Sequence, residues 1–148
     1  MTVSIRPVED RDKKSWNSLY EGYSIFYKVT QTQDMRDQVW LWLHDSMHET
    51  CGFVAEDEHG EVIGLAHYRQ FARPLAAATG GFLDDLFVDP AARGSGAADA
   101  LIQALKDEGV RKGWTVIRWI TAEDNYRARG VYDKLAAQTK WVTYDIKL

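Results

Sequence analysis

The stretch that decides the fold reads Leu83-Asp84-Asp85-Leu86-Phe87-Val88-Asp89-Pro90-Ala91-Ala92-Arg93-Gly94-Ser95-Gly96-Ala97-Ala98. Its first part predicts a strand over residues 81–88 that ends at Asp89-Pro90. Its last part opens a helix from about Ser95, whose apolar stripe continues through Leu101 and Leu105 and which ends at residues 109–113. The glycines remove side chains beside the first helical amides, which are free donors at the positive end of the helix dipole. Such a strand, loop and helix suit a phosphate or pyrophosphate.

Two better-known phosphate motifs do not match this loop. The dinucleotide fingerprint requires a third glycine beyond the position that Ala98 occupies, and the P-loop requires Gly-Lys followed by Ser or Thr. A Gly-x-Gly turn before a helix is also ordinary turn chemistry, so the loop alone leaves both interpretations open.

Outward from this unit, periodicity predicts alternating helices and strands. The expected elements are a strand over 3–6, a helix through 16–23, a helix over 33–43 capped by Thr32, strands over 52–56 and 62–71 joined by a turn, a loop over 72–80, the central unit, a strand over 115–121, a helix over 125–137 and a final strand over 141–146. This order predicts a mixed α+β domain spanning residues 1–148, with helices on both faces of the sheet.

Composition restricts the possible partners of the chain. The 148 residues carry 18 basic and 22 acidic side chains, a net charge of -4, so we expect no nucleic-acid partner. No apolar run approaches the ~20 residues of a membrane span, and charged residues fill positions 1–14, so we expect neither membrane insertion nor export. The single cysteine, Cys51, fits a cytoplasmic protein.

Two motifs resemble the GNAT acetyltransferase superfamily. Residues 93–98 match its Gln/Arg-x-x-Gly-x-Gly/Ala signature, and Asn125, Ala128 and Tyr132 reproduce its Asn-x-x-Ala-x-x-x-Tyr helix. The resemblance implies the GNAT fold, with a mixed central sheet of about six to seven strands. It also implies acetyl-CoA as acetyl donor and, because the family is often dimeric, a homodimer.

The strand over 83–88 narrows the resemblance. It is most similar to the Leu-Glu-Asp-Phe-Phe-Val strand of the diamine (spermidine/spermine) acetyltransferases, with Asp84 one methylene shorter than their glutamate. The tyrosine-rich N-terminal helix resembles the branch of amino-acid and histone-tail acetyltransferases. We therefore expect acetyl transfer to a small primary amine, a polyamine or an amino acid. The alternatives are a protein-lysine or histone-tail acetyltransferase and a non-catalytic CoA-binding module.

The resemblance assigns the donor site to the central unit. The backbone amides of the loop would bind the pyrophosphate, the pantetheine arm would lie along the end of the strand, and Asn125 would hydrogen-bond its far side. The expected cofactor-binding residues are Leu86, Phe87, Val88, Arg93, Gly94, Ser95, Gly96, Ala97, Ala98 and Asn125.

Amine acetylation requires a base, because an amine is protonated near neutral pH, and an acid for the departing thiolate. The resemblance implies these catalytic roles for Asp84 and Tyr132, and stabilisation of the oxyanion by a backbone amide near Leu86 or Phe87. Regular alternation places Asp84 on the face of Leu86 and Asp85 on the opposite face. A bulge would reverse the choice between the two carboxylates, which therefore stays open.

The remaining signals concern the acceptor and metals. Seven of the eighteen aromatic residues lie within 16–42. Helical spacing predicts that Trp16 and Leu19 belong to a core stripe, whereas the resemblance places residues 21–27 at the acceptor-binding loop of the GNAT fold. A carboxylate among aromatic faces suits an ammonium group, and the expected substrate-binding residues are Glu21, Tyr23, Phe26, Tyr27 and Asp85. His44 and His48 have a helical i, i+4 spacing but no evident third ligand, so we expect no metal site.

Overall fold

The structure is a computed structural model that describes residues 2–148. Its strands and helices follow the chain in this order: β1 (Ser4–Pro7), α1 (Lys13–Phe26), α2 (Gln33–His44), β2 (Cys51–Glu56), β3 (Val62–Arg73), β4 (Ala78–Val88), α3 (Ala97–Lys112), β5 (Ile117–Arg118) and α4 (Tyr126–Leu135). Short 3₁₀ turns precede α1, join β3 to β4 and follow β4. The predicted mixed α+β order is confirmed up to α4.

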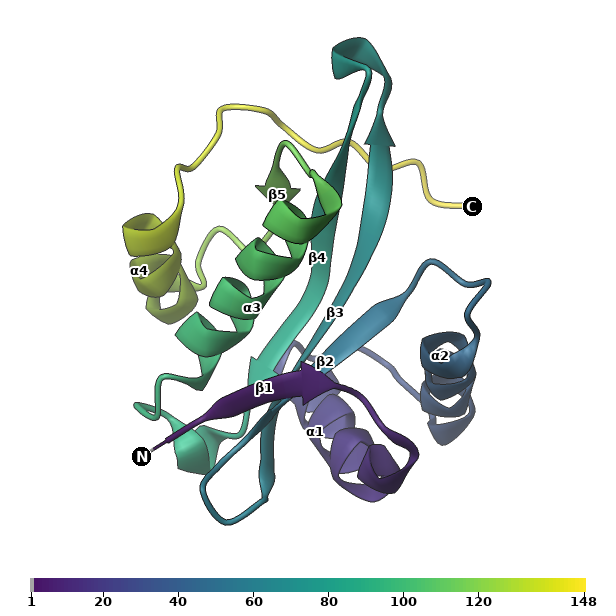
Figure 1. Cartoon of the computed structure of the whole chain (residues 1–148), viewed down its shortest axis with the longest axis vertical. Helices are drawn as coiled ribbons and strands as arrows, with labels where there is room; N and C mark the ends of the chain where they lie inside the picture. Colours follow the sequence, from purple (N-terminus) through teal and green to yellow (C-terminus); the bar gives the residue numbers. More distant parts are fainter. Residues whose placement is uncertain (1) are drawn as a thin grey trace.

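The strands form one sheet in the order β1-β2-β3-β4-β5. The first four strands pair antiparallel, whereas β5 runs parallel to β4. The prediction of six to seven strands is too high, because five strands form within residues 2–148. Figure 1 shows the twisted sheet from β1 to β5, with the long β3–β4 hairpin projecting beyond the helices.

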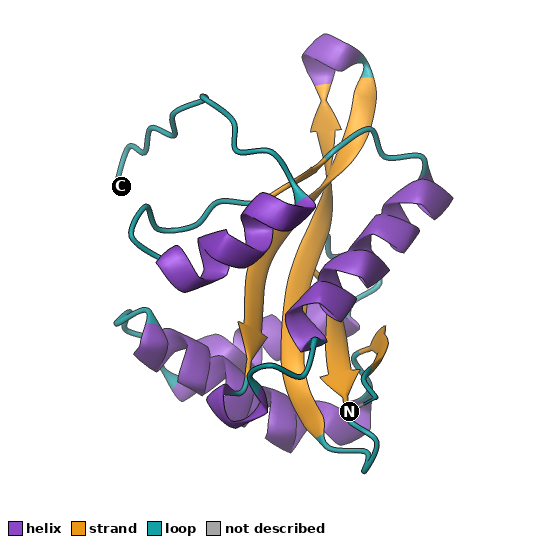
Figure 2. Ribbon diagram, turned by 90° about the vertical axis from the view of Figure 1, so that its left-hand side faces the viewer, coloured by secondary structure: helices purple, strands orange, loops and turns teal. Residues whose placement is uncertain are grey.

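Helices cover both faces of the sheet, as predicted. On one face, α3 buries the apolar stripe Ala97, Leu101, Ile102 and Leu105 against the strands. On the other face, α1 and α2 pack Trp16, Leu19, Tyr20 and Trp40 around Leu65 of β3. Figure 2 shows α3 on one side of the sheet and α1 and α2 on the other. Burial of these stripes, rather than helix propensity, holds the helices in place.

Two helix ends follow the sequence signals closely. The Thr32 hydroxyl accepts a hydrogen bond of 3.2 Å from the amide of Met35, so the predicted N-cap of α2 is confirmed. Helix α3 ends at Lys112 because Gly113 adopts a φ of 74°, a left-handed conformation that glycine takes without strain. None of the helices within residues 2–148 is long and apolar enough to cross a membrane.

The predicted loop over 72–80 is wrong, because most of it belongs to two strands. Pairing continues as far as Arg73 and Ala78, and the chain reverses in a 3₁₀ turn over Pro74–Ala76. Pro74 stands at the start of that turn, where no backbone donor is required. At Gly80 a Cβ would lie 2.9 Å from the Phe71 ring, so this glycine permits close cross-strand packing rather than a break.

Two further strand predictions are also wrong. The strand expected over 115–121 shrinks to Ile117–Arg118, and the final strand expected over 141–146 does not form. A strand requires a neighbour for its backbone groups, and β5 offers an edge of two residues. The side chains that alternate in the final segment remain exposed instead, at 89% for Trp141, 91% for Tyr144 and 89% for Ile146.

Candidate active site

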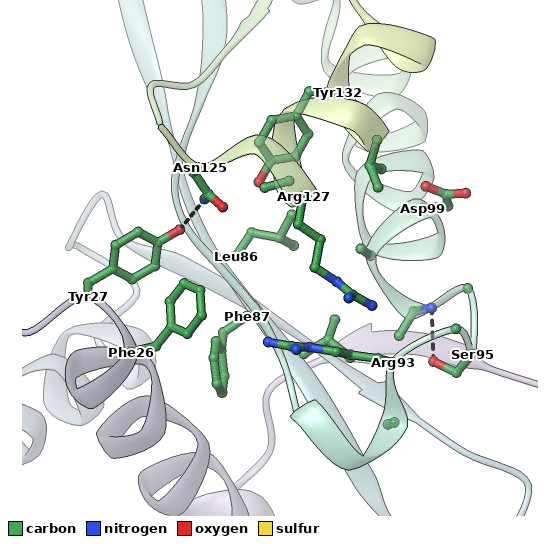
Figure 3. Close-up of a pocket in the computed structure, with 18 residues that line it drawn as sticks. Phe26, Tyr27, Leu86, Phe87, Arg93, Ser95, Asp99, Asn125, Arg127 and Tyr132 are labelled. Atoms are coloured by element: carbon green, nitrogen blue, oxygen red, sulfur yellow. Dashed lines mark hydrogen bonds between the residues drawn. The ribbon is translucent and has the colours of Figure 1, made fainter. Parts of the chain in front are cut away.

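A pocket opens where the two parallel strands part. Strands β4 and β5 pair only at Gly81–Ile117 and Phe82–Arg118, so β4 has a free edge beyond Phe82. The pocket lies between this free edge, the start of α3, the end of α1 and helix α4 (Figure 3). Its lining residues are Phe26, Tyr27, Leu86, Phe87, Val88, Ala92, Arg93, Gly94, Ser95, Gly96, Ala97, Ala98, Asp99, Asn125, Arg127, Ala128, Val131 and Tyr132.

One end of the pocket presents backbone donors. Gly94 and Gly96 adopt φ values of 82° and 84°, and no atom lies within 4 Å of where a Cβ would stand on either residue. These left-handed conformations turn the chain so that α3 starts at Ala97 with its first amides at the pocket wall. Ser95 Oγ accepts a 3.3 Å hydrogen bond from the amide of Ala97. Free amides at a helix N-terminus form an anion site.

Two arginines reinforce this positive end. Arg93 from the loop and Arg127 from α4 both extend into the pocket, and Figure 3 shows their guanidinium groups one above the other near the start of α3. Arg129 lies elsewhere, because it donates to the backbone oxygen of Glu123 and to Gln138. Fixed guanidinium groups bind phosphate oxygens in a planar fork.

The opposite wall is held by a hydrogen bond between α4 and α1. Asn125 Nδ2 donates to the Tyr27 hydroxyl over 3.0 Å and to Thr121 Oγ1 over 3.2 Å. Tyr132, two turns further along α4, directs its hydroxyl toward the middle of the pocket (Figure 3). Burial raises the pKa of Tyr132 to about 12, so the phenol carries its proton at neutral pH.

A β-bulge in β4 places the two adjacent carboxylates. His67 of β3 pairs with Asp85 but Tyr68 pairs with Leu83, so Asp84 is an extra residue in the ladder. Asp84 contacts Arg69 at 3.1 Å and Asp85 contacts His67 at 2.8 Å. Because His67 and Arg69 are two residues apart on one strand, both carboxylates face the same side of the sheet. The predicted alternation is therefore wrong at Asp84, for the reason that a bulge breaks it.

Asp85 belongs to a buried hydrogen-bond network that spans three elements. Trp16 Nε1 donates to His67 Nε2 over 2.9 Å, and the indole nitrogen can only donate, so Nε2 carries no proton. The neutral ring therefore carries its proton on Nδ1 and donates it to Asp85 Oδ2 over 2.8 Å. The Tyr20 hydroxyl donates to the same oxygen over 2.8 Å. His67 is 1% exposed, so this network holds Asp85 in one orientation.

The two carboxylates differ in acidity. Burial pushes the pKa of Asp85 upward, but hydrogen bonds from His67 and the neighbouring tyrosines outweigh it, and the pKa lies below its usual value. Burial raises the pKa of Asp84, and Arg69 offsets this only in part. Asp85 is therefore a fixed anion, and Asp84 is the more basic of the two.

The predicted acceptor residues fall into separate places. Phe26 and Tyr27 line the pocket, and Tyr23 packs between Tyr27 and Phe87 with ring centroids 4.8 and 5.7 Å away. Glu21 instead forms a 3.1 Å ion pair with Arg36 of α2 and is not part of the pocket lining. Its charge is already compensated, which leaves Asp85 as the anion beside the aromatic side chains.

All ten residues that the sequence assigns to the donor line this one pocket. The lining fits acetyl-CoA: an amide-rich, arginine-bearing end suits its phosphates, and the free edge of β4 offers backbone groups to an extended amide-containing arm. The chemistry of the lining and the shape of the opening thus agree with the class of enzyme that the motifs suggest.

Comparison with known proteins defines that class. The family model "Acetyltransferase (GNAT) family" matches residues 16–137. The chain belongs to this family; it is an N-acetyltransferase, and acetyl-CoA is its donor. It is 27% identical over 143 residues to the D-amino-acid N-acetyltransferase HPA3 of Saccharomyces cerevisiae, covering 96% of this chain and 89% of that protein. It is 29% identical over 133 residues to the N-acetyltransferase YhfO of Bacillus subtilis, covering 89% of this chain and 87% of that protein.

Solved structures support the same fold. A ribosomal-protein-alanine N-acetyltransferase from Brucella melitensis superposes with a TM-score of 0.83 at 22% identity, over all of both chains. The acetyltransferase AAC(6')-Iy, solved with the bisubstrate analogue CoA-S-monomethyl-acetylneamine, superposes with a TM-score of 0.82 at 21% identity, over 100% of this chain and 99% of that one.

Sequence reasoning missed several residues of the site. It gave His67 no partner, and it treated Trp16 as core alone, although the two form the buried link to Asp85. It assigned no role to Gln31, whose Oε1 is buried with no hydrogen-bond partner in the described part of the chain. The signal that could have found the link is a tryptophan and a histidine that both face the site side of the sheet.

Proposed function

We propose that this enzyme acetylates the primary amine of a small molecule, a polyamine or an amino acid, by direct attack of the amine on the thioester. The observation that carries the proposal is the bulge in β4, which sets two carboxylates of different acidity side by side. They lie immediately before Leu86, where the donor pocket begins. The name of the yeast relative, a D-amino-acid N-acetyltransferase similar along 96% of this chain, supports an amino-acid acceptor.

Binding and deprotonation divide between the two carboxylates. Asp85, held ionised by His67 and Tyr20, binds and orients the ammonium group of the acceptor. Asp84, the more basic carboxylate, takes a proton from it, directly or through water. The free amine can then attack the thioester carbonyl. Tyr20 and Tyr23 enclose the ammonium with aromatic faces, which adds cation–π attraction.

When the amine attacks, negative charge develops on the carbonyl oxygen, and it passes to the sulfur when the carbon–sulfur bond breaks. Successive amides of a strand point to opposite edges, so one of the amides of Leu86 and Phe87 faces the free edge of β4 and stabilises the oxyanion. The bond to sulfur breaks, and the protonated Tyr132 hydroxyl gives its proton to the departing thiolate. The second proton that the amine nitrogen loses on becoming an amide then restores the Tyr132 hydroxyl, directly or through water. Acetyl-CoA supplies the activated acetyl group, and the chain supplies the position, the base and the acid.

The first test replaces the base and the acid. Asp84→Asn and Tyr132→Phe are each expected to lower kcat by about 100-fold, the usual size of a general acid or base contribution, in an assay of thiol release with a working amine. The fall of kcat toward acid pH in the wild type, which reports protonation of Asp84, should disappear in Asp84→Asn. Matched controls are Asp107→Asn on α3 and Tyr126→Phe on α4; residue Tyr126 is 76% exposed.

The outcomes separate the assignments. Unchanged kcat in both variants would show that these residues are not catalytic. A screen that offers polyamines, amino acids and lysine-containing peptides would identify the acceptor class, and acetylation of the peptides alone would favour the protein-lysine alternative.

The chain is also proposed to act as a homodimer in the cytoplasm. The exposed aromatic and aliphatic side chains of the segment after α4, such as Trp141 and Ile146, support a partner surface. The single cysteine agrees with a reducing compartment. Light scattering of the purified protein tests the oligomeric state.

A further inference from the structure

Two arginines lie on the face of the sheet that carries Asp84 and Asp85. Arg69 of β3 pairs with Phe82 of β4, and Phe82 pairs with Arg118 of β5, so these three residues form one row across three strands. Paired residues share a face, and the row continues the side of the sheet on which His67 lies. Figure 1 shows the three strands of this row, β3, β4 and β5, side by side.

Aromatic rings hold this row in place. The Arg69 guanidinium lies 4.9 Å from the centroid of the Phe82 ring, and the Arg118 guanidinium lies 5.5 Å from that of Phe71. The two rings meet edge to face at 6.1 Å. Stacking on a ring leaves the donor edge of a guanidinium free for a planar anion. The four side chains therefore form a preorganised cationic patch beside the two carboxylates.

Arg69 is only partly used within the protein. Its Nε atom contacts the carboxylate of Asp84 at 3.1 and 3.3 Å, whereas its two Nη atoms have no hydrogen-bond partner within residues 2–148. The side chains of Arg69 and Asp84 are each 34% exposed, so a ligand can reach both. Arg118, which stacks on Phe71, is exposed and has no ion-pair partner in the described part of the chain.

Acceptors for hydrogen bonds remain free at the other end of the site. The 2.8 Å hydrogen bonds from His67 and Tyr20 both end on Asp85 Oδ2, so Oδ1 takes neither of them. The Gln31 side chain lies beside Tyr20, and its buried Oε1 has no hydrogen-bond partner among residues 2–148. These are the groups that an ammonium ion satisfies.

We propose that the acceptor is an α-amino acid, whose ammonium group binds at Asp85 and whose carboxylate binds to Arg69 and Arg118. This inference rests on the proposed function and narrows its substrate class. Arg69 stands two residues from His67, the partner of Asp85, and a strand rises ~3.3 Å per residue, so the two ends lie ~7 Å apart along the sheet. A zwitterion with a hydrogen bond of ~3 Å at each end spans that distance.

Charge on this face distinguishes amino acids from polyamines. A polyamine lying along this face would bring a second ammonium group toward the two guanidinium groups that stand next to the Asp84–Asp85 pair. Like charges so placed repel a second ammonium group. An amino acid instead satisfies both ends at once.

The test compares amino acids with partners that lack the carboxylate. Purified enzyme is assayed for thiol release with acetyl-CoA and a panel of D- and L-amino acids, their carboxamides and the corresponding decarboxylated amines. The kcat/KM for the best amino acid is expected to be at least about 10-fold higher than the kcat/KM for the carboxamide of that amino acid. Arg118→Gln, which leaves the carboxylates untouched, should raise the amino-acid KM about 10-fold and leave the KM of the carboxamide unchanged. Arg118→Lys should restore part of the loss.

Controls keep the outcomes distinct. Arg111→Gln removes a surface arginine of α3 that pairs with Glu108, and its kinetics should match the wild type. Equal use of amino acids and carboxamides, or no effect of Arg118→Gln on an amino acid that is acetylated, would overturn the carboxylate site while leaving amine acetylation intact. Absence of any acetylated amine, with acetyl-CoA binding retained, would overturn the proposed function and the acceptor class together.

Discussion

The two ends of the active site are built in different ways. The donor end is made mainly of backbone: two glycines with positive φ, the first amides of α3 and the free edge of β4. The acceptor end is made of side chains from three elements, joined through Trp16, His67 and Asp85. The first is a local arrangement that a short motif can encode. The second forms only when Trp16 packs on His67, 51 positions away in the sequence, and His67 on Asp85, 18 positions away.

This difference sets the sensitivity of each end to substitution. A backbone site tolerates many side chains but not the loss of a conformation, so its weak points are the glycines. A buried side-chain network fails when any one partner is left without a hydrogen bond. The predictions below use these weak points to separate the two ends.

The largest effect is expected at the acceptor end. Asp85→Asn removes the anion that binds the ammonium group and should lower kcat/KM for the amine by about 1,000-fold, within the range of charged groups in catalysis. The KM for acetyl-CoA should change little, because Asp85 is not part of the donor pocket lining. Steady-state kinetics with each substrate varied in turn measures both constants. Equal changes in the two would contradict the separation of the ends.

A smaller effect is expected at the donor end. Gly96→Val forces a β-branched residue to a φ of 84°, a conformation that costs ~1–3 kcal/mol, so the loop should move away from it. The KM for acetyl-CoA is then expected to rise about 30-fold, with the KM for the amine nearly unchanged. Gly60→Val is the matched control, because it imposes the same strain at a φ of 78° in the turn between β2 and β3, outside the donor pocket lining. A normal acetyl-CoA KM in Gly96→Val would mean that the left-handed turn is not needed for the donor.

The smallest expected effect is on the free energy of unfolding, and the ionised Asp85 and Asp84 side chains change it in opposite directions. The lowered pKa of Asp85 means that its anion stabilises the folded state above the unfolded pKa of ~3.9, a contribution lost as the pH falls through the folded pKa. The raised pKa of Asp84 means that its anion destabilises the folded state above that folded pKa. At pH 7, Asp85→Asn should therefore lose about 1–3 kcal/mol of unfolding free energy, whereas Asp84→Asn should lose none.

Urea titrations at pH 7 and pH 3 measure these differences. The deficit of Asp85→Asn should shrink at the lower pH, where the wild-type carboxylate is losing its own contribution. Losses of equal size in both variants at pH 7 would show that the two carboxylates occupy equivalent environments, contrary to the network at Asp85.

The same contrast explains what the sequence could and could not predict. The β4–α3 unit and the donor pocket follow from local signals: an apolar strand, two glycines and a helical stripe. The bulge at Asp84 does not, because it depends on how β4 pairs with β3. The last strand failed for a related reason, since its alternation is correct for a strand but no neighbouring edge is long enough to accept it. A local sequence pattern predicts a strand but does not identify the strand with which it pairs.

The bulge at Asp84 also has a consequence for the evolution of this pair of carboxylates. Because one surplus residue turns two successive acids to the same side, the chemistry depends on the number of residues in β4 as much as on their identity. Deleting the codon of the extra residue, Asp84, would restore a regular ladder and leave Asp85 alone on this face, with every other residue of the chain unchanged. Insertions and deletions, rather than substitutions, are thus the mutations by which this pair of acids would be gained or lost.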